Sequence, residues 1–126
     1  TTSSTPVLRY QDLKSGVHIN GVGSFQPSMQ EIDSETIKNA LVFVDSRESA
    51  LSETGDLTIP IQEGIIGKNH LRAEIGELLE NPSLGRKTPD EITFFKSCGV
   101  AVQDVVAAGM ALEQAKKHNL GRIIRM

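Results

Sequence analysis

The stretch Gly16–Asp33, which reads GVHINGVGSFQPSMQEID, decides the fold because a short strand pattern leads directly into a glycine-containing loop. The apolar residues that interleave with polar residues and glycines are Val17, Ile19 and Val22. Gly21 and Gly23 allow the backbone to pass close to another group, and Pro27 stops a helix from starting inside the loop. In an open α/β sheet, a strand that ends in such a loop lies at the edge where ligands bind.

Downstream of this loop, the periodicity of apolar residues predicts alternating helices and strands. In chain order we expect a short helix over 35–39 capped by Asp33 or Ser34, a doubly buried strand at Leu41–Val44, a helical turn over 46–51, a loop over 53–56, a helix over 69–80, a strand at Ile92–Phe95, a long helix over 100–118 and a tail over 122–126. The small residues in the middle of the long helix predict close packing against a neighbouring backbone. Residues 57–67 alternate partly like a strand but contain Pro60, so we assign them no element.

Strands that alternate with helices indicate an α/β fold with a parallel sheet. Three predicted strands are too few to stand alone, so the chain is best explained as the second half of a larger doubly wound domain. Thr1 is not an initiator methionine, and Thr1–Thr5 has the composition of a strand end. We therefore expect a fragment whose missing half continues the sheet before Thr1. The alternatives are a trimmed terminus and a complete small α/β interaction domain whose open sheet edge a partner covers.

The composition argues against several classes of partner. The chain has 126 residues, 38% of them hydrophobic, as expected for one domain, and a net charge of −3 with both signs interspersed. It therefore offers no basic face for a nucleic acid and no polybasic or ~20-residue apolar segment for a membrane. The single cysteine, Cys98, excludes an internal disulfide and forms no metal-ligand cluster with the three scattered histidines. These features favour a cytoplasmic protein.

Three junctions that follow predicted strands are candidates for a site. They are Thr2-Ser3-Ser4, Val22–Ser24 and Lys96-Ser97. A parallel sheet brings the carboxyl ends of its strands to one edge, so we expect these junctions to converge. Taken singly, each has an ordinary structural explanation, since a serine after a strand commonly caps a helix and a lysine is commonly solvated. Neither a Gly-x-Gly-x-x-Gly loop nor a P-loop occurs, and Cys98 favours a buried, inert thiol.

Six blocks spread over nearly the whole chain resemble, in order and spacing, the carboxyl-terminal part of the ornithine cyclodeaminase/mu-crystallin family. The blocks are TTSSTPVL, GVHINGVGSFQPSMQEID, VFVDSRESAL, GDLTIPIQEGIIG, AEIGELL and EITFFKSCGVAVQDVVAA. The resemblance implies a Rossmann-type NAD(P)-binding domain of a dimeric, cytosolic enzyme that acts on amino acids or cyclic imines. Members include ornithine cyclodeaminases, alanine dehydrogenases and ketimine reductases.

The resemblance also implies that the family's glycine-rich dinucleotide loop and its amino-terminal substrate and dimer domain are absent from this sequence, so residues 1–126 alone should be inactive. By the family pattern, seven residues lie by the nicotinamide end of a bound NAD or NADP. They are Thr2, Ser3, Val22, Gly23, Ser24, Lys96 and Ser97. The nicotinamide would carry the hydride chemistry, and the protein would orient it.

Two positions depart from the cyclodeaminase pattern. Phe25 stands where cyclodeaminases carry an aspartate that acts on the substrate amine, and Lys96 stands where those enzymes often carry another aspartate. A phenylalanine exchanges no proton, which argues against the ornithine-cyclising reaction. A reductase or dehydrogenase for another amino or imino substrate stays open, as does a non-catalytic, mu-crystallin-like protein that binds a dinucleotide or a small ligand.

Overall fold

The computed structural model describes residues 1–122 and residue 124. Within this part of the chain, four parallel strands form one sheet in the order β1-β4-β2-β3. The strands are β1 (His18–Gly21), β2 (Leu41–Val44), β3 (Leu71–Glu74) and β4 (Thr93–Lys96). The predicted α/β class with parallel strands is confirmed.

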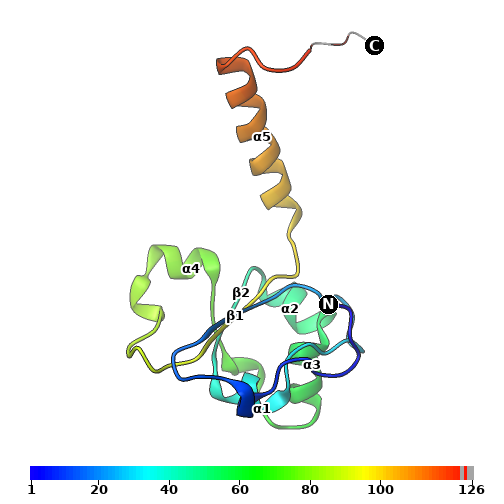
Figure 1. Cartoon of the computed structure of the whole chain (residues 1–126), viewed down its shortest axis with the longest axis vertical. Helices are drawn as coiled ribbons and strands as arrows, with labels where there is room; N and C mark the ends of the chain where they lie inside the picture. Colours follow the sequence, from blue (N-terminus) through cyan, green and yellow to red (C-terminus); the bar gives the residue numbers. More distant parts are fainter. Residues whose placement is uncertain (123, 125–126) are drawn as a thin grey trace.

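Five helices connect or follow these strands in the described residues. They are α1 (Ser34–Asn39), α2 (Arg47–Glu53), α3 (Gly55–Gln62), α4 (Ile75–Glu80) and α5 (Ala101–Lys117), with 3-10 turns at Tyr10–Asp12, Lys68–His70 and Pro82–Leu84. In Figure 1, α1, α2 and α3 gather in the body of the molecule, whereas α5 projects away from it. The side chain of Asp33 caps α1, and that of Ser46 caps α2. Asp33 is one of the two residues, Asp33 or Ser34, expected to cap the first helix.

The hydrophobic core lies between one face of the sheet and the helices α1 and α3. Phe94 of β4 is paired in register with Ile19 of β1 and Val42 of β2, so the three side chains share that face. Ile37 of α1 and Leu57 of α3 pack into the same cluster. Phe94 and Val42 are fully buried, and burial of such side chains stabilises the fold by about 1.5–3 kcal/mol each.

The predicted helix over 69–80 is wrong in its first half, because residues 71–74 form the edge strand β3. Leu71 and Ala73 are buried while Arg72 is exposed, and Ala73 pairs with Phe43 of β2. The apolar residues from Leu71 onward fit a helical period, but the first of them fit a period of two equally well. Pairing with β2 decides between the two. Of this segment only α4 is α-helical, and it ends before Asn81 and Pro82 as expected.

Residues 53–62 also differ from expectation. The predicted loop over 53–56 contains the end of α2 and the start of α3, and the unassigned segment continues α3 through Pro60. The proline removes one backbone donor and crowds the carbonyl of Asp56. Leu57 and Pro60 are both buried, so tertiary packing outweighs this local cost.

The first residues form no strand, although a strand end was expected there. They run beside the loop that follows β1 instead. The Gln30 amide donates to the Ser3 carbonyl at 2.9 Å, and the Val7 amide donates to the Glu31 carbonyl at 2.8 Å. The amino-terminal segment therefore forms one wall of this loop.

The long carboxyl-terminal helix is confirmed, but its apolar face finds no packing partner among the described residues. Exposed apolar side chains on α5 are Val102, Val105, Val106, Met110 and Leu112. No helix in the described residues is both long and apolar enough to cross a membrane. Of the predicted tail over 122–126, residues 123, 125 and 126 lie outside the described part.

Candidate functional site

Two of the three predicted junctions lie side by side at the carboxyl edge of the sheet. Strands β1 and β4 are neighbours, and Gly21 pairs in register with Lys96. One residue further on, the Ser97 amide donates to the Gly21 carbonyl at 3.0 Å. Val22–Ser24 and Lys96-Ser97 therefore leave the sheet together, as the parallel arrangement predicts.

The amino-terminal junction joins them through close backbone contact. A Cβ atom at Gly23 would lie 2.0 Å from the carbonyl oxygen of Thr1, so only glycine allows this approach. Ser3 is tied to the same loop through Gln30, and Thr2 lies exposed between these contacts. The structure thus brings all seven predicted site residues to one edge.

Glu31 holds the start of the loop. Its Oε2 accepts hydrogen bonds from the amides of Gly23 at 2.7 Å and Ser24 at 3.1 Å, and its Oε1 accepts one from the amino group of Thr1. Burial alone would raise the pKa of the Glu31 carboxyl, but these hydrogen bonds outweigh burial and hold the pKa below its usual value. Glu31 is therefore an ionised anchor for the loop.

Ser24 supports the loop rather than facing the edge. Its side chain is fully buried, its Oγ donates to the Met29 carbonyl at 2.7 Å, and it shares a hydrogen bond of 2.7 Å with the Thr54 hydroxyl. Contact between Ser24 and a ligand would have to come from its backbone.

Lys96 is also buried, so its reading as a solvated surface lysine is wrong. Its Nζ lies 3.6 Å from Asp56 Oδ2 and 4.0 Å from Glu31 Oε2. Burial raises the pKa of the Asp56 carboxyl, although hydrogen bonds from the Ile32 and Glu31 amides and the charge of Lys96 act in the opposite direction. The side chain of Lys96 thus points into a buried charge cluster.

Asp45, directly after β2, holds the junction between β4 and α5. Its Oδ2 accepts hydrogen bonds from the Ser97 hydroxyl at 2.9 Å and from the amides of Cys98 and Gly99 at 2.9 and 2.8 Å. Burial would raise the pKa of Asp45, but these bonds, with one from the Ser46 amide, keep that pKa below its usual value. Each of the two loops at the edge is therefore anchored by a carboxylate.

Cys98 should be slow to react with alkylating reagents. Burial, together with the charge of Asp45, raises the pKa of its thiol to about 11, so the reactive thiolate is scarce at neutral pH. We expect iodoacetamide at about pH 8 to modify the folded chain many times more slowly than the urea-unfolded chain. Intact mass measured over time checks this. Equal rates in the two states would contradict it.

Two large apolar side chains are exposed at the edge. Val22 is 67% exposed and Phe25 is 52% exposed, and both belong to the loop anchored by Glu31. His18 lies further back on β1, where its Nδ1 pairs with the Thr93 hydroxyl at 2.8 Å and its Nε2 with Asn20 Oδ1 at 3.2 Å. These contacts indicate a structural role for His18 and Asn20. The loop therefore offers apolar contact surface beside backbone polar groups.

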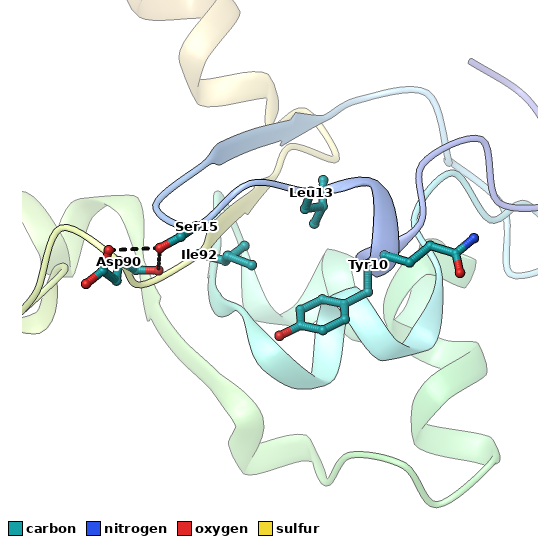
Figure 2. A pocket seen from close by; sticks show the side chains of 6 residues that line it. Tyr10, Leu13, Ser15, Asp90 and Ile92 are labelled. Carbon is teal, nitrogen blue, oxygen red and sulfur yellow. Dashed lines mark hydrogen bonds between the residues drawn. The ribbon is translucent and has the colours of Figure 1, made fainter.

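A pocket of about 410 Å³ lies at the opposite edge of the sheet (Figure 2). Ser15 and Asp90, which hydrogen-bond to each other there, precede β1 and β4 in the chain. The pocket is therefore at the amino ends of the strands, away from the converging loops. Among the described residues, no group of three or more His, Cys, Asp or Glu side chains could hold a metal ion.

The anchoring residues were not among the predicted site residues. They are Glu31, Asp45, Thr54 and Asp56. Asp45 could have been found, because a carboxylate directly after a doubly buried strand must lie at the carboxyl edge. Thr54 and Asp56 are distant in sequence from the loop they hold. Glu31 lies at the end of that same loop, but no spacing pattern marks it as the acceptor of the Gly23 and Ser24 amides.

Comparisons with known proteins agree with this geometry. The profile of the ornithine cyclodeaminase/mu-crystallin family matches residues 1–119. A Δ1-pyrroline-2-carboxylate reductase of Bacillus cereus is 46% identical over 125 residues, which are 98% of this chain and 38% of that protein.

Solved structures show the same arrangement of elements. The Thermococcus litoralis Δ1-pyrroline-2-carboxylate reductase, in complex with NADH and L-proline, superposes with a TM-score of 0.91 at 40% identity, covering 98% of this chain and 38% of that one. An archaeal alanine dehydrogenase dimer with bound NAD gives a TM-score of 0.87 at 36% identity. The match covers 100% of this chain and 39% of that one. The chain thus spans less than half the length of the relatives it matches.

Proposed function

Because this chain belongs to the ornithine cyclodeaminase/mu-crystallin family, we propose that it is the carboxyl-terminal part of an NAD(P)-dependent reductase of cyclic imino acids. The observation that carries the proposal is the loop Val22–Phe25, which presents apolar side chains at the carboxyl edge of the sheet. The relatives named as pyrroline-2-carboxylate reductases support the choice of substrate class.

The residue at position 25 favours reduction over cyclodeamination. Reduction of a protonated imine adds a hydride to the C=N carbon and leaves the nitrogen as an amine, so it needs no acid at that position. Loss of ammonia and ring closure require proton transfers to and from nitrogen. Phe25 can perform none of these, which places the lyase reaction of the family second to a reductase.

Features of three residues support placing the nicotinamide end of a dinucleotide at this edge. Gly23 lets the loop lie close to the amino-terminal segment, and Val22 offers an apolar contact for a flat ring. The Ser97 amide already donates to the Gly21 carbonyl, so the Ser97 carbonyl is the group offered to a carboxamide. We assign the dinucleotide-facing surface to Thr2, Ser3, Val22, Gly23 and Ser97, with Ser24 and Lys96 contributing through their backbones. When bound, NADH or NADPH would supply the hydride. The chain's own contribution is to hold and orient that ring.

The rest of the enzyme would come from a longer protein that contains this chain. The chain corresponds to 38% of the Bacillus cereus relative, and in the described residues β1 pairs on one side only. The apolar face of α5 also lies uncovered there. We propose that further strands extend the sheet past β1, and that a substrate and dimer domain completes a cytoplasmic homodimer. Residues 1–126 alone would be inactive.

A second candidate function is a non-catalytic protein of the mu-crystallin type that binds a dinucleotide or a small apolar ligand. Phe25 favours it, because an exposed aromatic side chain can contact an apolar ligand and carries no group that exchanges a proton. The test is to mix the longer protein with NADH or NADPH and a panel of cyclic imines and keto acids with ammonia, and to follow nicotinamide absorbance. Turnover of a cyclic imine supports the reductase. Dinucleotide binding with no turnover on any member of the panel supports the binding protein.

Replacing Phe25 by alanine should weaken substrate binding more than dinucleotide binding. The change removes an exposed ring from the loop and leaves the backbone contacts of Gly23 and Ser24 with Glu31 in place. We expect the KM for the imine to rise about tenfold, which corresponds to a lost apolar contact, and the KM for NADH to change little. Steady-state kinetics with each substrate varied in turn checks this. A rise confined to the KM for NADH would contradict it.

A further inference from the structure

Lys96 is the last residue of β4, yet its side chain is fully buried beneath the edge that carries the candidate site. Its Nζ has no hydrogen-bond partner among the described residues and instead faces the carboxylates of Asp56, at 3.6 Å, and Glu31, at 4.0 Å. Burial of a charge is costly unless opposite charges face it. These two carboxylates are therefore what makes a buried ammonium tolerable there.

The same two carboxylates fix both ends of the loop after β1. Glu31 Oε2 accepts from the amides of Gly23 and Ser24 at the start of the loop. Asp56 Oδ1 accepts from the amides of Glu31, at 2.6 Å, and Ile32, at 3.1 Å, at its end. The loop geometry thus depends on two buried acids that would repel each other without a cation between them.

The amino group of Thr1 also donates to Glu31. In the longer protein, the nitrogen of this residue would be a peptide amide, which donates the same bond without a charge. Among the described side chains within 4.0 Å of these two carboxylates, Lys96 supplies the positive charge. The negative charges of Glu31 and Asp56 are then balanced by Lys96.

We infer that Lys96 is a positioning residue, whose ammonium group holds Glu31 and Asp56 together and through them fixes the loop Val22–Phe25 against β4. The inference rests on the proposed function, because it takes that loop as a wall of the dinucleotide and imine site. Lys96 would touch neither ligand through its side chain. Its substitution would alter binding by loosening the loop.

Two substitutions test this through the charge of the cluster. Lys96→Met keeps an unbranched side chain of similar length and removes the positive charge. Asp56→Asn removes one negative charge but keeps an oxygen that accepts from the amides of Glu31 and Ile32. The double variant therefore restores the net charge of the cluster without restoring the lysine. Lys68→Met, on an exposed 3-10 turn, is the matched control.

In the longer protein, we expect Lys96→Met to raise the KM for the dinucleotide about tenfold, Lys68→Met to leave it unchanged, and the Lys96→Met/Asp56→Asn double variant to recover most of the loss. A residue that only filled space would show no such rescue by Asp56→Asn. An unchanged KM in Lys96→Met, or a double variant no better than the single one, overturns the inference. If Lys96→Met does not fold, a folded double variant with a near-normal KM supports it, and a double variant that also fails to fold overturns it.

Amide hydrogen exchange separates this inference from the proposed function. We expect the amides of Gly23 and Ser24 to exchange about tenfold faster in Lys96→Met and to regain protection in the double variant. This readout needs no cofactor. A wild-type longer protein that binds no dinucleotide would refute the proposed function, while the exchange rates would still decide the role of Lys96. Unchanged protection of both amides in Lys96→Met overturns the inference that Lys96 is a positioning residue.

Discussion

Alanine at position 23 should abolish most dinucleotide binding by the longer protein and lower its free energy of unfolding by about 3 kcal/mol. A Cβ atom at Gly23 would lie 2.0 Å from the carbonyl oxygen of Thr1 and 2.1 Å from its nitrogen, and neither atom is the flexible end of a side chain. The amino-terminal segment would have to move away from the loop. That movement would also break the hydrogen bond that the nitrogen of Thr1 donates to Glu31, which holds the start of the loop.

The matched control for this substitution is Gly76→Ala. Gly76 lies in the exposed helix α4, and a Cβ atom there would meet nothing within 4 Å. Alanine should stabilise this helix by about 0.5–1 kcal/mol, since glycine is a poor helix former. Urea denaturation and fluorescence titration with NADH measure both variants. If Gly23→Ala kept wild-type stability and NADH affinity, the close approach to Thr1 would matter for neither, which would contradict this prediction.

Replacing Asp45 by alanine should have the second large effect. The carboxylate accepts from the Ser97 hydroxyl and from the amides of Cys98 and Gly99, so its removal leaves several donors without partners at the start of the segment leading to α5. We expect a loss of about 3 kcal/mol in unfolding free energy and a fall in kcat/KM of at least about tenfold. Asp45→Asn, which keeps one acceptor oxygen, should lie between wild type and Asp45→Ala. Asp12→Asn, at an exposed position, is the control.

The contribution of Asp45 should also depend on pH with a definite sign. The pKa of Asp45 in the folded protein lies below its ordinary value of 3.8, so the folded state favours the ionised form. This stabilisation is fully present above the ordinary value and is lost as the pH falls through the lowered one. The stability difference between wild type and Asp45→Asn should therefore stay constant above about pH 5 and shrink as the pH falls below about 4, toward the lowered pKa. A difference that grows on acidification would contradict the assignment.

The sequence predicted the strands whose apolar pattern fits a strand and no other element. LVFV at Leu41–Val44 is long enough and apolar enough for a doubly buried strand, and Ile92–Phe95 matches β4 within one residue. Leu71–Glu74 was misread because its apolar spacing fits both a helix and a strand, and only pairing with β2 resolves it. Helix α3 was not predicted because Pro60 disfavours a helix locally. The tertiary packing that outweighs this cost cannot be seen in the local sequence.

The candidate site, too, could be predicted only in part. Convergence of the junctions after β1 and β4 could be predicted, because it follows from parallel strands in one sheet. The burial of Ser24 and Lys96 could not, since it depends on Thr54, Asp56 and Glu31 approaching from elsewhere in the chain. Phe25 was identified only through the family resemblance.

The most direct test of the account is a fluorescence titration with NADH and NADPH, carried out on the longer protein and on residues 1–126 alone. The account predicts saturable binding of at least one dinucleotide by the longer protein, and binding at least about 100-fold weaker by residues 1–126, whose sequence contains no Gly-x-Gly-x-x-Gly loop. Equally tight binding by residues 1–126, or no binding of either dinucleotide by the longer protein, would contradict it.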